Sequence, residues 1–441
     1  MCFVKIKRLV VKDLYGNVGY DVKFNDDITF LYGDNGCGKT TILNILTYII
    51  TGKIYELFRY SFSKIELSFK QENDKKQQKI IVSYEDSSTI LINFISNGES
   101  IETLVERIFY NLDEKERKHE YFSEYPILEK INNIFNYVYL PLNRNSSFKS
   151  NPIPFYKNKK MSPFRFSERP SFDRYDHMLQ DVEYLVSSAY NKSNFLLNRT
   201  NEEFSNKILK SFLDVENIVS TNDIVKNLMS FDPLEIDEIK QKYIKVLKTL
   251  GKWDNVSDKK VSTFFSSLKN DIIDKNRIND PSFTIEFLFK LSEISKITNI
   301  IEQAKQTEQA KKEITRPIDT FVKIVNSYLY NEVTQKEIYI NENGNIFLKT
   351  LNSDNISINN VSSGEKQIIT FFAYLILGLE EIKQSIFIVD EPELSLHLKW
   401  QRQFVDSILS VNNDIQLIFA THAPEIIGRH KNKAVKLVPT L

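Results

Sequence analysis

The stretch Gly33-Asp34-Asn35-Gly36-Cys37-Gly38-Lys39-Thr40 decides the fold. It follows an apolar segment, Ile28 to Tyr32, and precedes the helical pattern Thr41 to Leu46. The order of strand, G-x-x-x-x-G-K-T and helix predicts a phosphate-binding loop, because the glycines let backbone N–H groups turn inward and the helix N-terminus adds partial positive charge. A glycine-rich turn that only caps a helix is the alternative, and the flanking strand and helix disfavour it.

The motif gives individual residues roles in binding ATP and Mg²⁺. Lys39 is expected to reach the β- and γ-phosphates, and Thr40 to supply a hydroxyl ligand for Mg²⁺. We expect further nucleotide contacts from residues of the loop and the first helical turn, namely Gly33, Asn35, Gly36, Gly38 and Thr41.

Composition excludes several classes of protein. The 441 residues predict two or three domains, or one domain with a large insertion. The 58 basic residues balance 58 acidic ones, so binding of a polyanion would need a local patch of basic residues. With only Cys2 and Cys37, no disulfide framework is expected, which suits a cytoplasmic protein. The start lacks the features of a signal peptide. The longest apolar run, Ile368 to Leu379, is shorter than the ~20 residues of a membrane span and predicts a buried helix.

The N-terminal part reads mainly as strands. Alternating apolar residues predict strands over 3–12 and 22–32, so a β layer leads into the phosphate loop. Residues 101–135 are charged and predict helix, followed by a strand over Phe135–Leu140. Three more strands with polar connections indicate an antiparallel β subdomain: Ser61–Phe69, Gln78–Tyr84 and Thr89–Ile95.

A basic loop follows between Arg144 and Pro170. It carries seven basic residues against the single acid Glu168, interleaved with aromatic residues and prolines. Such a loop suits contact with nucleic acid or an acidic partner, and it equally suits a solvated connector. The sequence leaves both interpretations open.

Residues 171–330 predict an inserted helical domain. Apolar residues recur at helical spacing, as in Phe287, Leu291 and Ile294, whereas Glu302–Glu313 is almost without them and is expected to face solvent. This segment is too short for the long heptad arm of a chromosome-structuring protein. Pro317 is expected to break the helix. A hairpin is then predicted from two strands, Glu337–Ile340 and Ile346–Leu351.

The C-terminal part supplies a second group of site residues. Val361-Ser-Ser-Gly-Glu-Lys-Gln367 leads into the apolar helix, and the apolar strand Ser385–Val389 ends in Asp390 and Glu391. An acid at a strand end beside a phosphate loop can hold Mg²⁺ through water, and the next acid can polarise an attacking water. A third strand, Ile415–Ala420, leads into His422.

Together these motifs resemble the ABC-type ATPases, and within them the soluble branch of SMC-type proteins, RecF repair proteins and OLD nucleases, with the AAA_15-like and AAA_21-like ATPases. The resemblance implies an α/β fold: an ABC-type P-loop ATPase head with an antiparallel β subdomain and an inserted helical domain. The expected parts are 1–144 with the phosphate loop, 145–334 with the basic loop and inserted helices, and 335–441 with the remaining motifs.

The same resemblance implies the remaining roles. Asp390 supports Mg²⁺, Glu391 is the catalytic base and His422 is the γ-phosphate switch. Ser362 and Gly364 reach the γ-phosphate of a nucleotide held by the opposite subunit, so a head-to-tail homodimer with two ATP molecules is expected. A Q-loop glutamine is missing, and Arg144 with Asn143 matches an OLD-like Leu-Pro-x-x-Arg element instead.

For function, the chain resembles the stand-alone ATPase subunits of anti-phage systems such as PARIS and Septu. After His422 only one strand, Ala434–Val438, is expected, and no nuclease motif is recognised. The implied function is ATP-dependent assembly that senses a phage protein or DNA and holds or releases a separate Toprim-like or HNH-like nuclease.

The alternative, from another class, is a DNA-repair clamp of the SMC or RecF kind. A transporter ATPase is disfavoured by the missing Q-loop and the helical insertion. A nuclease-like gene beside this one favours defence, whereas a recombination gene or none favours repair.

Overall fold

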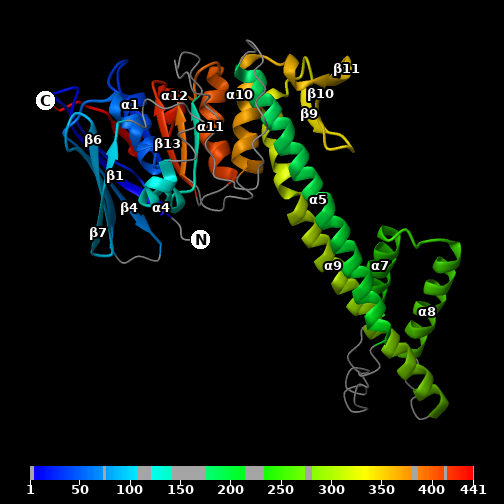
Figure 1. The fold of residues 1–441 in the computed structure, drawn as a ribbon. Helices are drawn as coiled ribbons and strands as arrows, with labels where there is room; N and C mark the ends of the chain where they lie inside the picture. Colours follow the sequence, from blue (N-terminus) through cyan, green and yellow to red (C-terminus); the bar gives the residue numbers. More distant parts are fainter. Residues whose placement is uncertain are drawn as a thin grey trace. The chain divides into compact units, whose positions relative to one another are not determined.

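The computed structural model describes residues 4–72, 76–107, 121–141, 174–213, 233–273, 281–378, 386–411 and 415–440. These form two compact units (Figure 1). The head unit consists of Met1–Ser188 and Ile318–Leu441, and the helical unit of Ala189–Pro317. Arg144 and the basic loop after it lie outside the described residues.

A five-stranded parallel sheet forms the centre of the head unit. Its order is β14-β3-β13-β12-β8, and all four strand pairs are parallel. Every residue of β12 and β13 is buried, as expected for strands covered on both faces. The strands are β3 (Ile28–Tyr32), β8 (Tyr137–Pro141), β12 (Ile386–Asp390), β13 (Gln416–Thr421) and β14 (Ala434–Lys436).

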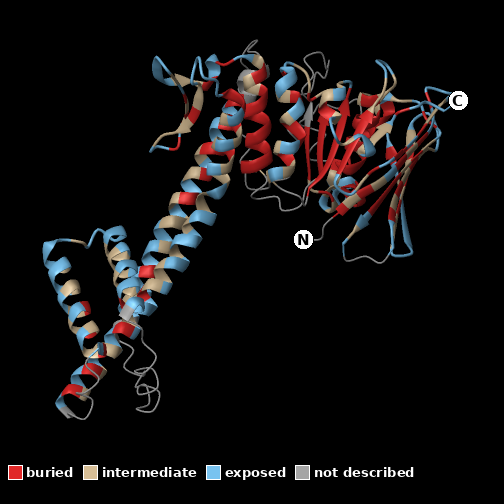
Figure 2. Cartoon of the chain, turned by 180° about the vertical axis from the view of Figure 1, so that it is seen from behind, coloured by how far each residue is buried: buried red, intermediate tan, exposed pale blue. Residues whose placement is uncertain are grey.

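Alternate residues of the parallel strands face two different layers. Ile388 and Ile418 belong to the core shared with α1 (Lys39–Ile50) and the antiparallel sheet. Phe387 and Phe419 instead contact phenylalanines of α10 (Ser363–Phe372) and α11 (Leu398–Val411). The parallel sheet is therefore covered on one face by α1 and on the other by α10 and α11. The exposure colouring in Figure 2 shows it as an almost wholly buried layer.

The second sheet of the head unit is antiparallel and six-stranded, in the order β2-β1-β4-β5-β6-β7. Buried and partly exposed residues alternate along β6, as in a sheet with one face on the core. The strands are β1 (Val4–Leu14), β2 (Val18–Lys23), β4 (Lys64–Gln71), β5 (Gln78–Tyr84), β6 (Thr89–Ser96) and β7 (Glu99–Glu106). The predicted α/β class with an antiparallel subdomain is confirmed.

The expected helix over 101–135 is wrong at its beginning. Residues up to Glu106 form the edge strand β7, and helix within this range is described at 121–124 and in α4 (Pro126–Ile134). β7 pairs with β6 through an Asn97-Gly98 turn in which both residues have positive φ, 54° and 94°. This turn fixes a hairpin, and the charges of β7 are tolerated because an edge strand faces water.

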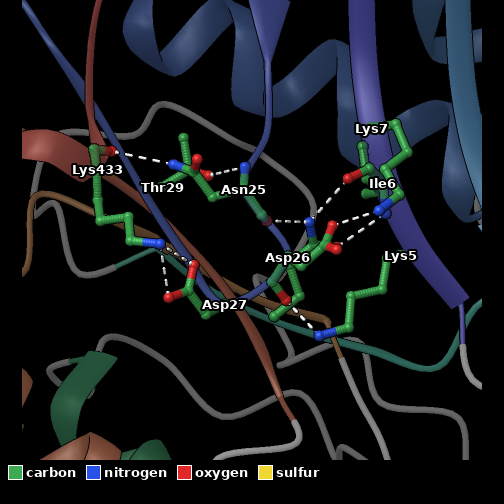
Figure 3. Close-up of polar contacts among 9 residues, drawn as sticks. Lys5, Ile6, Lys7, Asn25, Asp26, Asp27, Thr29 and Lys433 are labelled. Carbon is green, nitrogen blue, oxygen red and sulfur yellow. Dashed lines mark hydrogen bonds and ion pairs between the residues drawn. The ribbon is translucent and has the colours of Figure 1, made fainter.

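Gln416 joins the two sheets. Its buried side chain accepts the Ile6 N–H at 2.8 Å and donates to the Ile6 and Asn25 carbonyls at 2.8 and 2.7 Å. This occurs where β1 shifts register between Ile6 and Arg8. Lysines surround the junction (Figure 3): Lys5 and Lys7 bind Asp26, and Lys433 binds Asp27 at 2.9 Å.

A small three-stranded sheet precedes α10 in the chain. The predicted hairpin is confirmed, because β9 (Glu337–Ile340) and β10 (Ile346–Thr350) pair antiparallel, and β11 (Ser353–Ser357) adds a third strand. The predicted apolar helix is buried and spans α10 and a π-helical continuation over Ala373–Gly378. The short α12 (Pro424–Ile427) follows β13.

The described residues of the inserted region include four long helices: α5 (Arg174–Leu213), α7 (Pro233–Thr249), α8 (Asn255–Ile273) and α9 (Pro281–Leu329). The expected break at Pro317 is wrong, since Pro317 lies inside α9. Proline costs about 3 kcal/mol in a helix. Burial of Phe321, Val325 and Tyr328 just beyond it stabilises the continued helix. No described helix combines the length and apolarity needed to cross a membrane.

Candidate nucleotide-binding site

The phosphate loop lies between β3 and α1, at the carboxyl edge of the parallel sheet. Gly36 and Gly38 have positive φ values of 81° and 90°, which other residues rarely adopt. A Cβ atom on Gly38 would lie 2.5 Å from the Tyr20 hydroxyl, and that hydroxyl donates to the Cys37 carbonyl at 3.0 Å. Tyr20 of β2 therefore fixes the loop backbone, a role that the sequence did not reveal.

The Lys39 side chain lies buried within this loop. Its ammonium donates to the carbonyls of Gly33 and Asp34 at 2.9 and 3.0 Å. It also lies 3.1 Å from Nδ1 of His422, which follows β13. The two residues, 383 positions apart in the chain, are thus in direct contact.

His422 bridges the loop lysine and the acidic strand end. Since an ammonium only donates hydrogen bonds, Nδ1 of His422 accepts from Lys39 and the ring proton lies on Nε2. Nε2 faces Glu391 Oε1 at 3.6 Å. Lys39, His422 and Glu391 therefore form a continuous chain of polar groups.

Asp390 ends β12 with its side chain buried, at 2 % exposure. Burial, together with the nearby Glu391 and Glu393 charges, raises its pKa to about 7 against the opposing effects of the Thr40 hydrogen bond and the Lys39 charge. Its Oδ1 atom has no hydrogen-bond partner in the described part of the chain. A buried carboxylate oxygen left without a donor, beside the Thr40 hydroxyl, fits a hard divalent cation.

The Thr40 hydroxyl and the Asp390 carboxylate are a pair of oxygen ligands that suits Mg²⁺ bound with a nucleotide. Within the described ranges, no cluster of three or more His, Cys, Asp or Glu residues could hold a metal by itself. Mg²⁺ commonly takes one or two protein oxygens and completes its shell with water and phosphate. Thr40 and Asp390 offer that number of protein ligands.

Glu393 ties the acidic loop to the end of β13. Its carboxylate accepts from the Thr421 hydroxyl at 2.8 Å and from the His422 N–H at 2.6 Å. Glu391, with a positive φ of 53°, donates its N–H to the Ala420 carbonyl at 2.8 Å. Sequence reasoning missed Glu393, although its position two residues after Glu391 places it on the same loop.

Ser362 and Gly364 lie at the start of α10, where they make a separate cluster. Ser362 and Glu365 form a reciprocal capping box, with the Ser362 N–H donating to Glu365 at 2.8 Å. A Cβ atom on Gly364 would lie 2.4 Å from the Ser395 carbonyl, so only glycine permits this approach. Their described contacts run to α10 and the loop after β12, and none to the phosphate loop.

Lys336 supports the capping box from the segment before β9. Its ammonium binds both carboxylate oxygens of Glu365, at 2.9 and 2.8 Å. Burial raises the pKa of Glu365, but Lys336 and the Ser362 N–H outweigh burial, so this pKa lies below its usual value. The start of α10 thus carries a charge-stabilised cap that the sequence did not predict.

The AAA_21 family, described as "AAA domain, putative AbiEii toxin, Type IV TA system", matches residues 28–428. The chain belongs to this family. Membership of an AAA family supports the predicted ATPase assignment.

Known relatives of this AAA_21 chain include the "Retron Vc95 probable ATPase" of Vibrio cholerae serotype O1 biovar El Tor. It is 22 % identical over 431 residues, which cover 94 % of this chain and 69 % of that protein. The Smc head domain of Pyrococcus furiosus, solved with an extended coiled coil bound to the C-terminal domain of ScpA, covers 96 % of this chain and 91 % of its own, at 14 % identity and a TM-score of 0.40. The Smc head domain of Pyrococcus yayanosii, solved with a coiled coil and joint, covers 96 % of this chain and 93 % of its own, at 14 % identity and a TM-score of 0.39.

Within this AAA_21 chain, the predicted residues fall into three groups. Lys39, Thr40, Asp390, Glu391 and His422 lie together. Gly33, Asn35, Gly36, Gly38 and Thr41 lie in or beside the phosphate loop, with Asn35 and Gly36 exposed. Ser362 and Gly364 lie apart on α10, and Arg144 lies outside the described residues.

A first prediction concerns Glu393 as a positioning residue. In Glu393→Gln, one acceptor oxygen is replaced by an NH₂ group that faces a donor, so the hold on Thr421 or the His422 N–H is lost. We expect ATP hydrolysis to slow by about tenfold while ATP affinity changes little, since neither contact binds the phosphate loop. Steady-state hydrolysis and nucleotide binding are measured beside Glu99→Gln, a control on the exposed edge strand. Equal loss of binding and turnover would show a merely structural role.

A second prediction concerns pH and Asp390. Because the pKa of this acid is raised to about 7 by folding, the native state holds a proton that the unfolded state has lost between about pH 4 and 7, so stability falls as pH rises through this window. Asp390→Asn should therefore stabilise the protein at pH 8, by on the order of 3–4 kcal/mol, and have little effect at pH 4.

The measurement is urea unfolding of both proteins across this pH range without added metal. Mg²⁺ with ATP should stabilise the natural protein more than the variant, which lacks one of the two proposed Mg²⁺ ligands. A constant difference between the two proteins at every pH would contradict the prediction, because it would not follow the titration of Asp390.

Proposed function

We propose that the chain is a Mg²⁺-dependent ATPase that acts in an anti-phage defence system. The convergence of Lys39, Thr40, Asp390, Glu391 and His422 at the carboxyl ends of three neighbouring parallel strands carries the proposal. This is the edge at which open α/β sheets bind ligands. The family match over residues 28–428 agrees with it.

In the proposed reaction, the loop N–H groups and the Lys39 ammonium bind the β- and γ-phosphates. Bound Mg²⁺, held by Thr40 and Asp390, would neutralise charge on the phosphate oxygens. Glu391 orients and deprotonates the attacking water, and His422 places its ring between Glu391 and Lys39. Glu393 keeps the backbone of His422 in position.

A homo-oligomer built on ATP-sandwich dimers is part of the proposal. Ser362 and Gly364 begin α10, whose first N–H groups are suited to a phosphate. Because their contacts in this chain lead away from the phosphate loop, a nucleotide bound by a second copy is the ligand they fit. In this arrangement 1–144 and 335–441 form the ATPase head, and 145–334 is inserted between its halves.

The defence role rests on the relatives. The family description names a toxin of a toxin–antitoxin system, and the Vibrio cholerae relative is named as a retron ATPase. Both names associate related ATPases with toxic or defensive systems. We therefore infer that ATP-dependent assembly holds or releases a separate nuclease, Toprim-like or HNH-like, in response to a phage protein or DNA.

The ATPase is tested with two substitutions. Lys39→Ala should abolish nucleotide binding, because the loop loses its only side-chain ammonium, whereas Glu391→Gln should bind ATP and hydrolyse it slower by orders of magnitude. Lys312→Ala, on an exposed part of α9, is the matched control. Undiminished ATP affinity in Lys39→Ala would overturn the assignment, and normal turnover in Glu391→Gln would mean that another residue is the base.

The defence role is tested by expression with the adjacent gene. Together with that partner, the chain should co-purify as a large complex whose toxicity depends on Lys39 and Glu391. Alone, it should hydrolyse ATP without cutting DNA or RNA. A hydrolysing chain that neither binds the partner nor changes its toxicity would retain the ATPase assignment and remove the defence role.

A further inference from the structure

The hairpin of α7 and α8 in the helical unit carries a concentrated positive charge. Between Lys240 and Lys260 there are seven lysines and two acids, Asp254 and Asp258, a net charge of +5 in a chain whose total is zero. We propose that the end of this hairpin, Lys245–Lys260, binds the phosphates of a nucleic acid. This segment is called the lysine tip below. The inference goes beyond the proposed ATPase function and does not depend on it.

The charges of the lysine tip are exposed and unpaired. In the described part of the chain, none of its lysines forms an ion pair, and all five are exposed: Lys245, Lys248, Lys252, Lys259 and Lys260. Three acids elsewhere on the hairpin are already engaged, since Glu238 binds Lys242, Asp237 binds Lys269 and Asp271 binds Lys290, and Glu235 lies in the first turn of α7, away from the lysine tip.

The remaining acids do not neutralise the lysine tip. The Asp254 carboxylate accepts the Ser257 N–H at 2.7 Å, and this hydrogen bond lowers the pKa of Asp254. It therefore serves as a cap for α8. The lysine tip carries five lysines and only two acids, Asp254 and Asp258, so its surface remains positively charged.

Packing does not explain why the hairpin extends this far. The apolar core of the helical unit lies at the other end, around Ile236 of α7, Ile272 of α8 and Phe287 of α9. None of the residues 244–260 is buried, and Figure 2 shows the turn between the helices in the colour of exposed residues. The lysine tip therefore contributes little to the fold and is free to contact a partner.

Helix electrostatics explains only part of the pattern. Lysines near the C-terminus of α7 are favourable, because the helix dipole is negative there. Lys259 and Lys260, however, lie past the first turn of α8, which starts at Asn255, so the helix dipole does not account for them.

The chemistry of the lysine tip favours nucleic acid over an acidic protein. Lysine is depleted at protein–protein interfaces, whereas its compact charge is suited to phosphate groups. Trp253 lies among the lysines, partly exposed, with the Lys248 ammonium 5.9 Å from its ring centre. An aromatic ring beside lysines is a combination that stacks bases and binds a single-stranded backbone.

The test uses the full chain and fluorescently labelled DNA of about 30 nucleotides, single-stranded or duplex. Lys248→Gln, Lys252→Gln and Lys259→Gln are combined in one variant. The matched control combines Lys207→Gln, Lys305→Gln and Lys312→Gln, which remove the same charge from exposed positions of α5 and α9 in the same unit. Fluorescence anisotropy gives the affinity of each protein between about 50 and 200 mM salt.

The tip variant should bind DNA at least about tenfold more weakly and lose about 2 from its salt slope, since each phosphate contact contributes about 0.7 for single strands and 0.9 for duplex. The control should stay within about twofold of the natural chain. A larger effect on single strands would identify that form as the ligand. Equal losses in both variants, or no binding by the natural chain, would overturn the proposal.

A local measurement uses Trp253 itself. The chain has two tryptophans, so Trp400→Phe leaves Trp253 as its only indole. Single-stranded DNA should then change the tryptophan fluorescence, and it should do so equally in a Lys39→Ala background. Fluorescence that stays constant at saturating DNA would show that the nucleic acid binds elsewhere. ATP hydrolysis, measured in parallel, separates failure of this inference from failure of the proposed ATPase.

Discussion

A buried carboxylate at the end of β12 is the constraint on which the site depends. Asp390 is buried, and one of its oxygens has no donor among the residues that the structure describes. The charges of Glu391 and Glu393 add to the cost of ionising it. Thr40 and Lys39 offset that cost only in part, so its pKa stays raised to about 7. A divalent cation supplied with a nucleotide would remove the remaining cost. Ionised Asp390 is therefore destabilised in the site without ligand, and a bound cation can stabilise it.

The register of the parallel sheet brings this carboxylate to the phosphate loop. Asp390 pairs with Ala420 and Thr421 pairs with Tyr32, so three strands end at the same level although their sequences are distant. β13, the central one of these strands, is held at both ends by side chains. Gln416 fastens its beginning to the antiparallel sheet, and Glu393 fastens its end to the acidic loop. A small movement of β13 would therefore change the position of His422, which directly follows this strand.

The parts that the sequence predicted are those governed by local pattern. The phosphate loop and the apolar strands β3, β12 and β13 follow from periodicity and glycine spacing, and β7 was missed because an edge strand can carry charges that resemble an exposed helix. Tyr20, Glu393 and Lys336 were missed for another reason. Tyr20 contacts a loop 17 positions away, and Lys336 binds an acid 29 positions away, so their roles exist only once the chain has folded.

Within the head unit, hydrogen bonds connect α10 and the C-terminal end of α9 through the segment between them. Asn326 of α9 pairs through its amide with both the N–H and the carbonyl of Ile338, at 2.7 and 3.0 Å, and Lys336 two residues earlier holds Glu365 of α10. Tyr328 adds a hydrogen bond to Ser407 of α11 at 2.9 Å. Because Glu365 also caps Ser362, the start of α10 is connected to α9 through Lys336 and Asn326. α9 itself continues through Pro317 without a break, so the segment that carries Asn326 and Tyr328 is the last part of one long helix.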